Sequence, residues 1–192
     1  MDTKKSIIDA SIKMFAKYGF DKTSVDDIAN AAGTAKGTLY YHFKSKDEIL
    51  LELMERGIED FSSTLRKKVE TGRDPNEKID IIIETQLDYF FRYRDFCRIL
   101  LTEIWRFENK WKTHIKQIQD QYLKIIEQTI NDGIKTGQFN PRLSEEAATV
   151  AVFSLVSLAS LDWAIFHTKR PKKEMVETIK TILKKGLLSE QK

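Results

Sequence analysis

The sequence predicts an all-α protein, on three observations. Glycine and proline are scarce, eight and three among 192 residues. Apolar residues recur with the 3.6-residue period of an amphipathic helix along the whole chain. No segment alternates apolar and polar residues as a half-buried strand does. The breaks between periodic segments predict about nine helices, divided into a three-helix head over residues 1–46 and a helical body over residues 47–192.

The three predicted helices of the head are closely spaced. The first ends at Gly19, a residue typical of a helix C-cap. Ser24 begins the second as its N-cap, with Asp27 three residues later in the position of a capping box, and Gly33 stops that helix after about two turns. The third helix follows after a turn of only ~3–4 residues. This spacing predicts a helix-turn-helix motif over about residues 24–43.

The body begins with a long helix, predicted from Lys46 to about Val69. Ser45 and Glu48 form a capping box at its start. Later helix boundaries follow from cap residues and breakers at Asp74–Pro75, Arg94–Asp95, Gly137, Asn140–Pro141, Ser144 and Pro171. The apolar run over residues 147–161 is shorter than the ~20 residues that span a bilayer, so we expect a buried helix and no membrane partner.

Composition and charge narrow the class of protein. The hydrophobic fraction of 41%, the charged fraction of 32% and a single cysteine are typical of a cytoplasmic protein without a disulfide framework. The net charge of +3 falls entirely within residues 1–46, where eight Lys and Arg residues face five Asp and Glu residues. A local positive excess attracts phosphate.

Residues 36–43, KGTLYYHF, carry the most specific signal. At ~100° per residue, Lys36, Gly37, Tyr40 and Tyr41 share the outward arc of the helix. The second helix of a helix-turn-helix enters the major groove, where lysine can donate to guanine or phosphate and glycine lets the groove wall approach. Tyrosine hydroxyls suit sugar and phosphate oxygens. The arc therefore predicts double-stranded DNA as a partner. The alternative is that the tyrosines pack on the fourth helix and the lysine is solvated.

Four neighbouring residues are weaker candidates for the same contact. Thr23 and Ser24 precede the second helix and Lys46 begins the fourth, where backbone N–H groups and the helix dipole attract phosphate. His42 lies at the edge of the inward arc, so it either contacts phosphate or caps the end of its helix.

The stretch TSVDDIANAAGTAKGTLYYHFKSKDEIL, residues 23–50, resembles the DNA-binding head of the TetR family of bacterial transcriptional regulators. The matching runs are S-x-x-D-I-A and A-G-x-x-K-G-x-L-Y-x-H-F-x-S-K-D, and the resemblance extends over residues 6 to about 55. It implies a nine-helix homodimer that binds an operator and is usually released by a small ligand. The residues that match DNA-contacting positions of relatives are Lys36, Gly37, Thr38, Tyr40, Tyr41, His42 and Lys46.

Two positions depart from the family pattern. Thr34 and Ala35 stand where many relatives have an aliphatic residue followed by serine. The usual serine cap of the third helix is therefore missing. Thr34 either caps that helix instead or reaches a base itself.

The aromatic residues of the body are either core or the walls of a ligand pocket. A pocket needs a few polar groups among the rings, and the resemblance implies that one exists. The candidate lining residues are Tyr89, Trp105, Trp111, Tyr122, Asp162 and Trp163. Wall composition favours a hydrophobic or aromatic small-molecule effector, whose identity the sequence leaves open.

The run over residues 147–161 also bears on assembly. A helix that is apolar on every face must be buried on every face, and a second subunit covers it more economically than one layer of helices. We therefore expect a homodimer through the helix after Ser144 and the helix after Pro171. The expected interface residues are Ala148, Ala151, Leu155, Ile179 and Ile182. The alternative is an internal helix of a monomer.

These features predict a sequence-specific transcriptional regulator, a repressor released from a palindromic operator by its ligand. The sequence does not favour an enzyme, because it has no nucleophile motif, glycine-rich phosphate loop, metal-ligand spacing or cofactor motif. We expect Cys97 to be a buried thiol. One alternative is an architectural DNA-binding protein that responds to no ligand. Another is a helical-bundle enzyme that uses carboxylates, although Glu-x-x-His pairs are absent.

Overall fold

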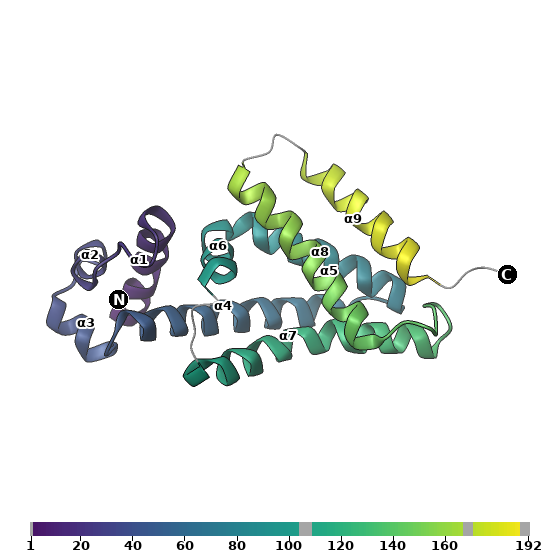
Figure 1. Cartoon of the computed structure of the whole chain (residues 1–192), viewed down its shortest axis with the longest axis horizontal. Helices are drawn as coiled ribbons and strands as arrows, with labels where there is room; N and C mark the ends of the chain where they lie inside the picture. The colour runs from purple at the N-terminus through teal and green to yellow at the C-terminus, as the bar shows by residue number, and fades with distance from the viewer. Residues whose placement is uncertain (1, 104–108, 167–170, 189–192) are drawn as a thin grey trace. The chain divides into compact units, whose positions relative to one another are not determined.

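The computed structural model describes residues 2–103, 109–166 and 171–188, without the side chains of residues 109–115, 118 and 163–166. Over these residues the chain is helical, with one isolated bridge pair and no longer strand (Figure 1). The helices are α1 Thr3–Tyr18, α2 Val25–Ala31, α3 Lys36–His42, α4 Lys46–Val69, α5 Pro75–Arg92, α6 Arg94–Glu103, α7 Asn109–Lys135, α8 Glu145–Phe166 and α9 Lys172–Leu187. The all-α class and the order of helices are confirmed.

The chain packs as two compact units. The first comprises residues 1–59 and 95–115, and the second comprises residues 60–94 and 116–192. Packing thus groups α6 and the first part of α4 with the three head helices. The boundary expected after residue 46 stays a prediction about independent folding.

The turns of the head are set by the cap residues that the sequence predicted. The Ser24 hydroxyl accepts a hydrogen bond from the Asp27 backbone N–H, and the Asp27 carboxylate accepts one from the Ser24 backbone N–H, which completes the capping box. Gly19 and Gly33 have φ angles of 82° and 65°, in the left-handed region that favours glycine. These residues fix where α1 and α2 end.

The first unit also anchors α6. A Cβ added to Gly57 of α4 would lie 2.0 Å from the ring of Phe96 in α6, so the two helices meet where only glycine fits. The Arg98 guanidinium donates a hydrogen bond to the Ala16 carbonyl of α1. Cys97 is buried beside them, as expected, and burial raises the pKa of its thiol to about 12.

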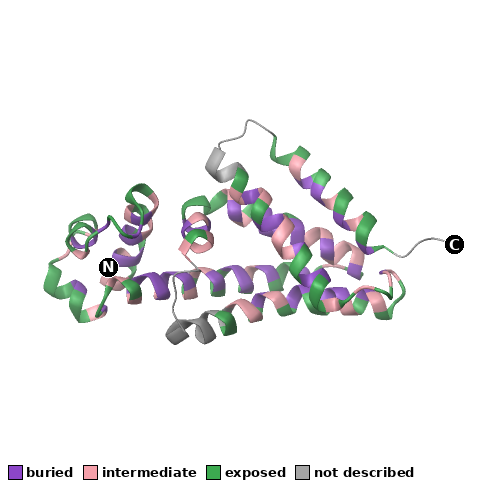
Figure 2. Ribbon diagram, viewed as in Figure 1, coloured by how far each residue is buried: buried purple, intermediate pink, exposed green. Residues whose placement is uncertain are grey.

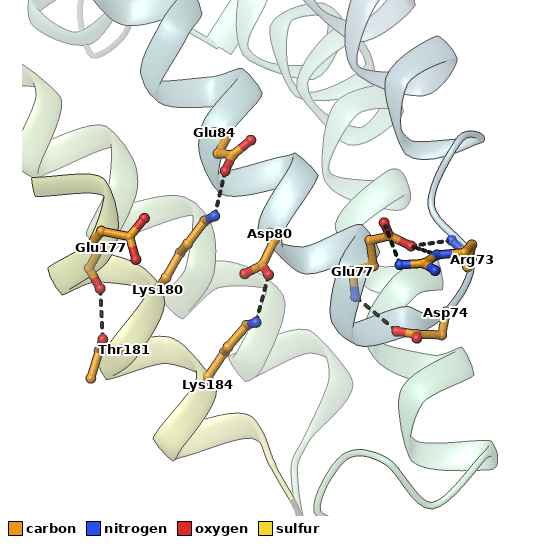
Figure 3. Close-up of polar contacts among 9 residues, drawn as sticks. All are labelled: Arg73, Asp74, Glu77, Asp80, Glu84, Glu177, Lys180, Thr181 and Lys184. Atoms are coloured by element: carbon orange, nitrogen blue, oxygen red, sulfur yellow. Dashed lines mark hydrogen bonds and ion pairs between the residues drawn. The ribbon is translucent and has the colours of Figure 1, made fainter. Parts of the chain in front are cut away.

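The second unit is built around the apolar faces of α5, α7 and α8, with α9 against α5 and α8. Its core includes Leu65, Ile79, Ile83, Leu87, Ile126, Ile130, Val152 and Val156. Three lysines of α9 also pair with three acids spaced four residues apart on α5, as Lys172–Asp88, Lys180–Glu84 and Lys184–Asp80. Figure 3 shows the latter two pairs. Apolar contact and charge therefore both hold α9.

Within a single chain α8 is not buried on every face, so burial of its remaining side by a second subunit stays a prediction. Val152 and Val156 are fully buried, whereas Val150 and Ala151 are exposed and Leu158 is 62% exposed. Figure 2 colours the chain by burial, and α8 carries both buried and exposed residues. One side of α8 packs into the core and the other remains open. No helix among the described residues is long and apolar enough to cross a membrane.

Candidate functional site

The outward face of α3 is formed as the sequence predicted. Leu39 is fully buried and turns the helix so that Tyr40 is 46% and Tyr41 86% exposed. Gly37 lies on the same open side, and a Cβ added there would meet no atom within 4 Å. The fold therefore does not require glycine at this position, although glycine lowers helix stability relative to alanine by up to about 1 kcal/mol. A binding partner that approaches the α3 backbone closely would explain the glycine better than the fold does.

Lys36 begins α3 and pairs with Asp26 of α2. Its Nζ lies 2.8 Å from one carboxylate oxygen of Asp26 and 2.9 Å from the other. Both side chains remain more than half exposed, at 56% and 57%. The hydrogen bond and charge of Asp26 raise the pKa of Lys36, which stays a cation.

The start of α3 differs from one expectation. Its N-cap position is Ala35, which offers no side-chain hydrogen bond, so Thr34 does not cap the helix. Thr34 is instead held through its backbone N–H, which donates to the Ala29 carbonyl. Thr38 is exposed on the next turn. His42 is half-buried, with its ring edge-on to Tyr41 at 5.2 Å between centroids.

The side chains of Lys46 and Thr23 are engaged within the head, and contact of these two residues with phosphate stays a prediction. The Lys46 ammonium donates to the Phe20 and Thr23 carbonyls at 2.6 and 2.9 Å and lies over the Phe20 ring. Thr23 is 1% exposed, and its hydroxyl donates to the Gly19 carbonyl at 2.7 Å. Both side chains are occupied in holding the turn between α1 and α2. Ser24 is exposed, but its hydroxyl is already hydrogen-bonded to Asp27 in the capping box.

A second candidate site lies in the core of the body. The Tyr122 hydroxyl donates to Gln86 Oε1 at 2.8 Å, and Gln86 Nε2 donates to Ser157 Oγ at 2.8 Å. All three residues are at most 4% exposed. The rings of Phe61 and Phe153 pack against Tyr122. Burial raises the Tyr122 pKa well above its ordinary value, so the group stays neutral.

The other ligand candidates are placed as follows. Tyr89 is partly buried, packs on Phe61 and hydrogen-bonds Asp60 at 3.3 Å. Asp162 is exposed. Trp105 and the side chains of Trp111 and Trp163 lie outside the described residues. Phe61 thus brings Tyr89 and Tyr122 together. Sequence reasoning missed Gln86 and Ser157, although a glutamine within the apolar stripe of α5 was an available signal.

The expected dimer residues divide into two groups. Ala148 and Ile179 are buried in the core of their own chain and present little surface to a partner, so their place at the interface stays a prediction. Ala151 is exposed, Leu155 partly buried, and Ile182 55% exposed. Val150 and Leu158, which the sequence analysis did not single out, also lie on the open side of α8.

Two family models match the chain. Residues 7–53 match the model described as bacterial regulatory proteins of the tetR family. Residues 72–162 match the model described as the tetracyclin repressor-like C-terminal domain. The first match contains most of the head and the outward face of α3, and the second contains Gln86 and Tyr122.

Curated relatives and solved structures cover most of the chain. The fatty acid metabolism regulator protein of Bacillus subtilis is 23% identical over 94% of this chain and 93% of its own. The repressor KstR2 of Rhodococcus jostii is 25% identical over 76% and 72%. The crystal structure of FadR from Bacillus subtilis in complex with stearoyl-CoA superposes with a TM-score of 0.87 at 22% identity, over 95% of this chain and 98% of that chain. This last likeness shows a shared fold.

Proposed function

Because the chain belongs to the TetR family of bacterial transcriptional regulators, we propose that it is a cytoplasmic repressor that binds a palindromic operator as a homodimer and leaves it when a lipophilic ligand enters the body. DNA binding in transcriptional regulation is the function of the family, whose members are regulators rather than enzymes.

The outward face of α3 is the observation that supports operator reading most. It combines a cation at Lys36, an open backbone at Gly37 and two hydroxyl-bearing rings at Tyr40 and Tyr41. A lysine can reach guanine or phosphate, and tyrosines can contact the sugar-phosphate backbone. Ser24, Thr34, Thr38 and His42 lie in the same motif and remain candidate contacts.

Two substitutions on this face test the proposal. A duplex selected by the unmodified protein from a random pool serves as the operator, and affinity is measured by fluorescence anisotropy at fixed salt. Lys36→Ala and Tyr41→Phe should each weaken binding by about tenfold, because a good base or phosphate contact contributes ~1–3 kcal/mol. Melting temperatures should not change, since both side chains are exposed.

Lys13→Ala provides a matched control, because it removes the same charge from an exposed position on α1. It should weaken binding far less than Lys36→Ala. Operator affinities equal to that of the unmodified protein in both α3 variants would remove α3 as the reading helix.

The buried cluster of Gln86, Tyr122 and Ser157 supports a lipophilic ligand. Its polar groups are neutral and surrounded by apolar side chains and rings, so it suits an uncharged chain or ring system with few polar atoms. A solved relative holds stearoyl-CoA, and another is a ketosteroid regulator. We favour a long-chain acyl-CoA, with a steroid as the second candidate.

Stearoyl-CoA, with free coenzyme A as its control, tests the ligand class. Stearoyl-CoA should raise the melting temperature and release the selected duplex, whereas coenzyme A should do neither. Tyr122→Phe leaves Gln86 Oε1 without this donor, so it should destabilise the free protein by about 1–3 kcal/mol and shift the stearoyl-CoA concentration needed for release. No thermal shift and no release with any lipophilic thioester or steroid would favour the architectural DNA-binding alternative.

The open side of α8 supports the homodimer. Val150, Ala151 and Leu158 are exposed there, and Ile182 is exposed on α9. A second copy of the chain would remove this apolar surface from water. It would also supply the two-fold symmetry that a palindromic operator requires.

A further inference from the structure

Asp26 is an acidic residue within a motif that we propose binds a polyanion. It lies in the first turn of α2, where a carboxylate favours the positive end of the helix dipole. It also faces the first residue of α3, and both of its carboxylate oxygens lie within 2.9 Å of the Lys36 ammonium. The two helices of the motif are therefore joined by a charged contact at the surface that α3 presents.

This contact contributes little to the stability of the fold. Both side chains are more than half exposed, and exposed ion pairs typically contribute ~0–1 kcal/mol. The contact instead matters for the charge balance at the start of α3. Lys36 places a cation at the positive end of the α3 dipole, and the first turn of α3 contains no acid and no side-chain cap. Asp26 supplies the missing counter-charge from the neighbouring helix.

We propose that Asp26 is a positioning residue that sets the sequence specificity of Lys36. The carboxylate holds the ammonium in one place before DNA arrives, and it competes with phosphate for the same cation. A correctly placed base acceptor offers a fixed, desolvated partner that overcomes this competition, whereas a phosphate on non-specific DNA does not. Asp26 therefore lowers non-specific affinity more than operator affinity. This inference rests on the proposed function of α3.

Asp26→Asn tests it, because the substitution keeps the shape of the side chain and removes its charge. Affinity is measured for the selected duplex and for a shuffled duplex of equal length and composition, over a series of salt concentrations. With Lys36 unopposed, one more cation is available to phosphate, so the log–log salt slope for shuffled DNA should steepen by about 0.9. At 0.1 M salt this corresponds to a gain in shuffled-DNA affinity of up to about eightfold. Operator affinity should change less, so the specificity ratio should fall.

Two controls separate this inference from simpler explanations. Asp9→Asn makes the same charge change at an exposed position of α1 and should leave the specificity ratio unchanged. In a Lys36→Ala background, Asp26→Asn should no longer alter the ratio, because Asp26 acts through Lys36. A purely structural role for Asp26 would change melting temperature without this coupling.

The outcomes also distinguish the inference from its premise. If Lys36→Ala weakens operator binding but Asp26→Asn leaves the specificity ratio unchanged, Asp26 is not a specificity residue and α3 still reads DNA. If Lys36→Ala changes neither operator affinity nor the ratio, the proposed function of α3 itself is wrong.

Discussion

Gly37 lies in the first turn of α3, at a position where an added Cβ meets no atom within 4 Å. Alanine is the better helix former by up to about 1 kcal/mol. We therefore expect Gly37→Ala to raise the free energy of unfolding while weakening operator binding, since the added methyl group stands between the α3 backbone and the groove. Urea denaturation and anisotropy on the same preparation measure both quantities.

Gly33→Ala is the matched control for this prediction. Gly33 has a positive φ of 65°, so alanine there should lower stability. If Gly37→Ala left operator affinity unchanged, the close approach of DNA to α3 would be contradicted.

At the scale of single residues, the sequence predicted the side-chain positions that depend on neighbours in the same helix. The outward position of Tyr40 and Tyr41 follows from helical geometry once Leu39 faces the core. It did not predict the contact of Lys46 with the Phe20 carbonyl, 26 residues away. That contact depends on how α4 meets the turn after α1, which periodicity does not describe.

At the scale of helices, the contact between α4 and α6 gives the sharpest prediction. Gly57→Ala would place a Cβ 2.0 Å from the Phe96 ring, and because Phe96 is buried, the ring has little room to move. We expect a loss of about 1–3 kcal/mol in the free energy of unfolding. Gly57→Ala combined with Phe96→Leu should recover part of it.

Gly186→Ala, on α9, is the control for this substitution, because a Cβ there meets open space. It should be neutral or stabilising. Equal effects at Gly57 and Gly186 would mean that the packing of α6 on α4 is not a tight fit.

Helix boundaries were predictable because caps are local. Ser24, Asp74 and Pro75 mark the starts of α2 and α5 through hydrogen bonds or a fixed φ within one turn. The buried face of α8 was not predictable, because residues 147–161 are apolar or small on every side and no face differs from the others. The packing of α5, α7 and α9 around α8 decides which side becomes core.

For the whole molecule, the exposed apolar side of α8 predicts the assembly. Leu158→Arg should leave the fold of the chain intact, because Leu158 is 62% exposed. In a dimer it would bury an unpaired charge at a cost of ~3–5 kcal/mol, which weakens self-association by more than about 100-fold. Sedimentation equilibrium of both proteins measures this. A monomeric unmodified protein, or a variant that still dimerises normally, would contradict the predicted interface.

The family fold could be predicted from the head alone, because the motif around α3 is a dense local pattern. The proposed ligand site could not be predicted in this way, because Gln86, Tyr122 and Ser157 meet from three helices that are distant in sequence. Which atoms line such a site depends on long-range packing. Lipophilic character is all that the composition of the body conveys.

The proposed function requires that two copies of α3 read a two-fold DNA site. Selection of bound duplexes from a random pool by the unmodified protein, followed by sequencing, tests this requirement most directly. We expect an inverted repeat whose half-sites are centred about one helical turn of DNA apart, roughly 10–10.5 base pairs, or a multiple of it. We also expect that Lys36→Ala fails to enrich that repeat. Enrichment of no sequence, or of the same repeat by Lys36→Ala, would contradict this requirement.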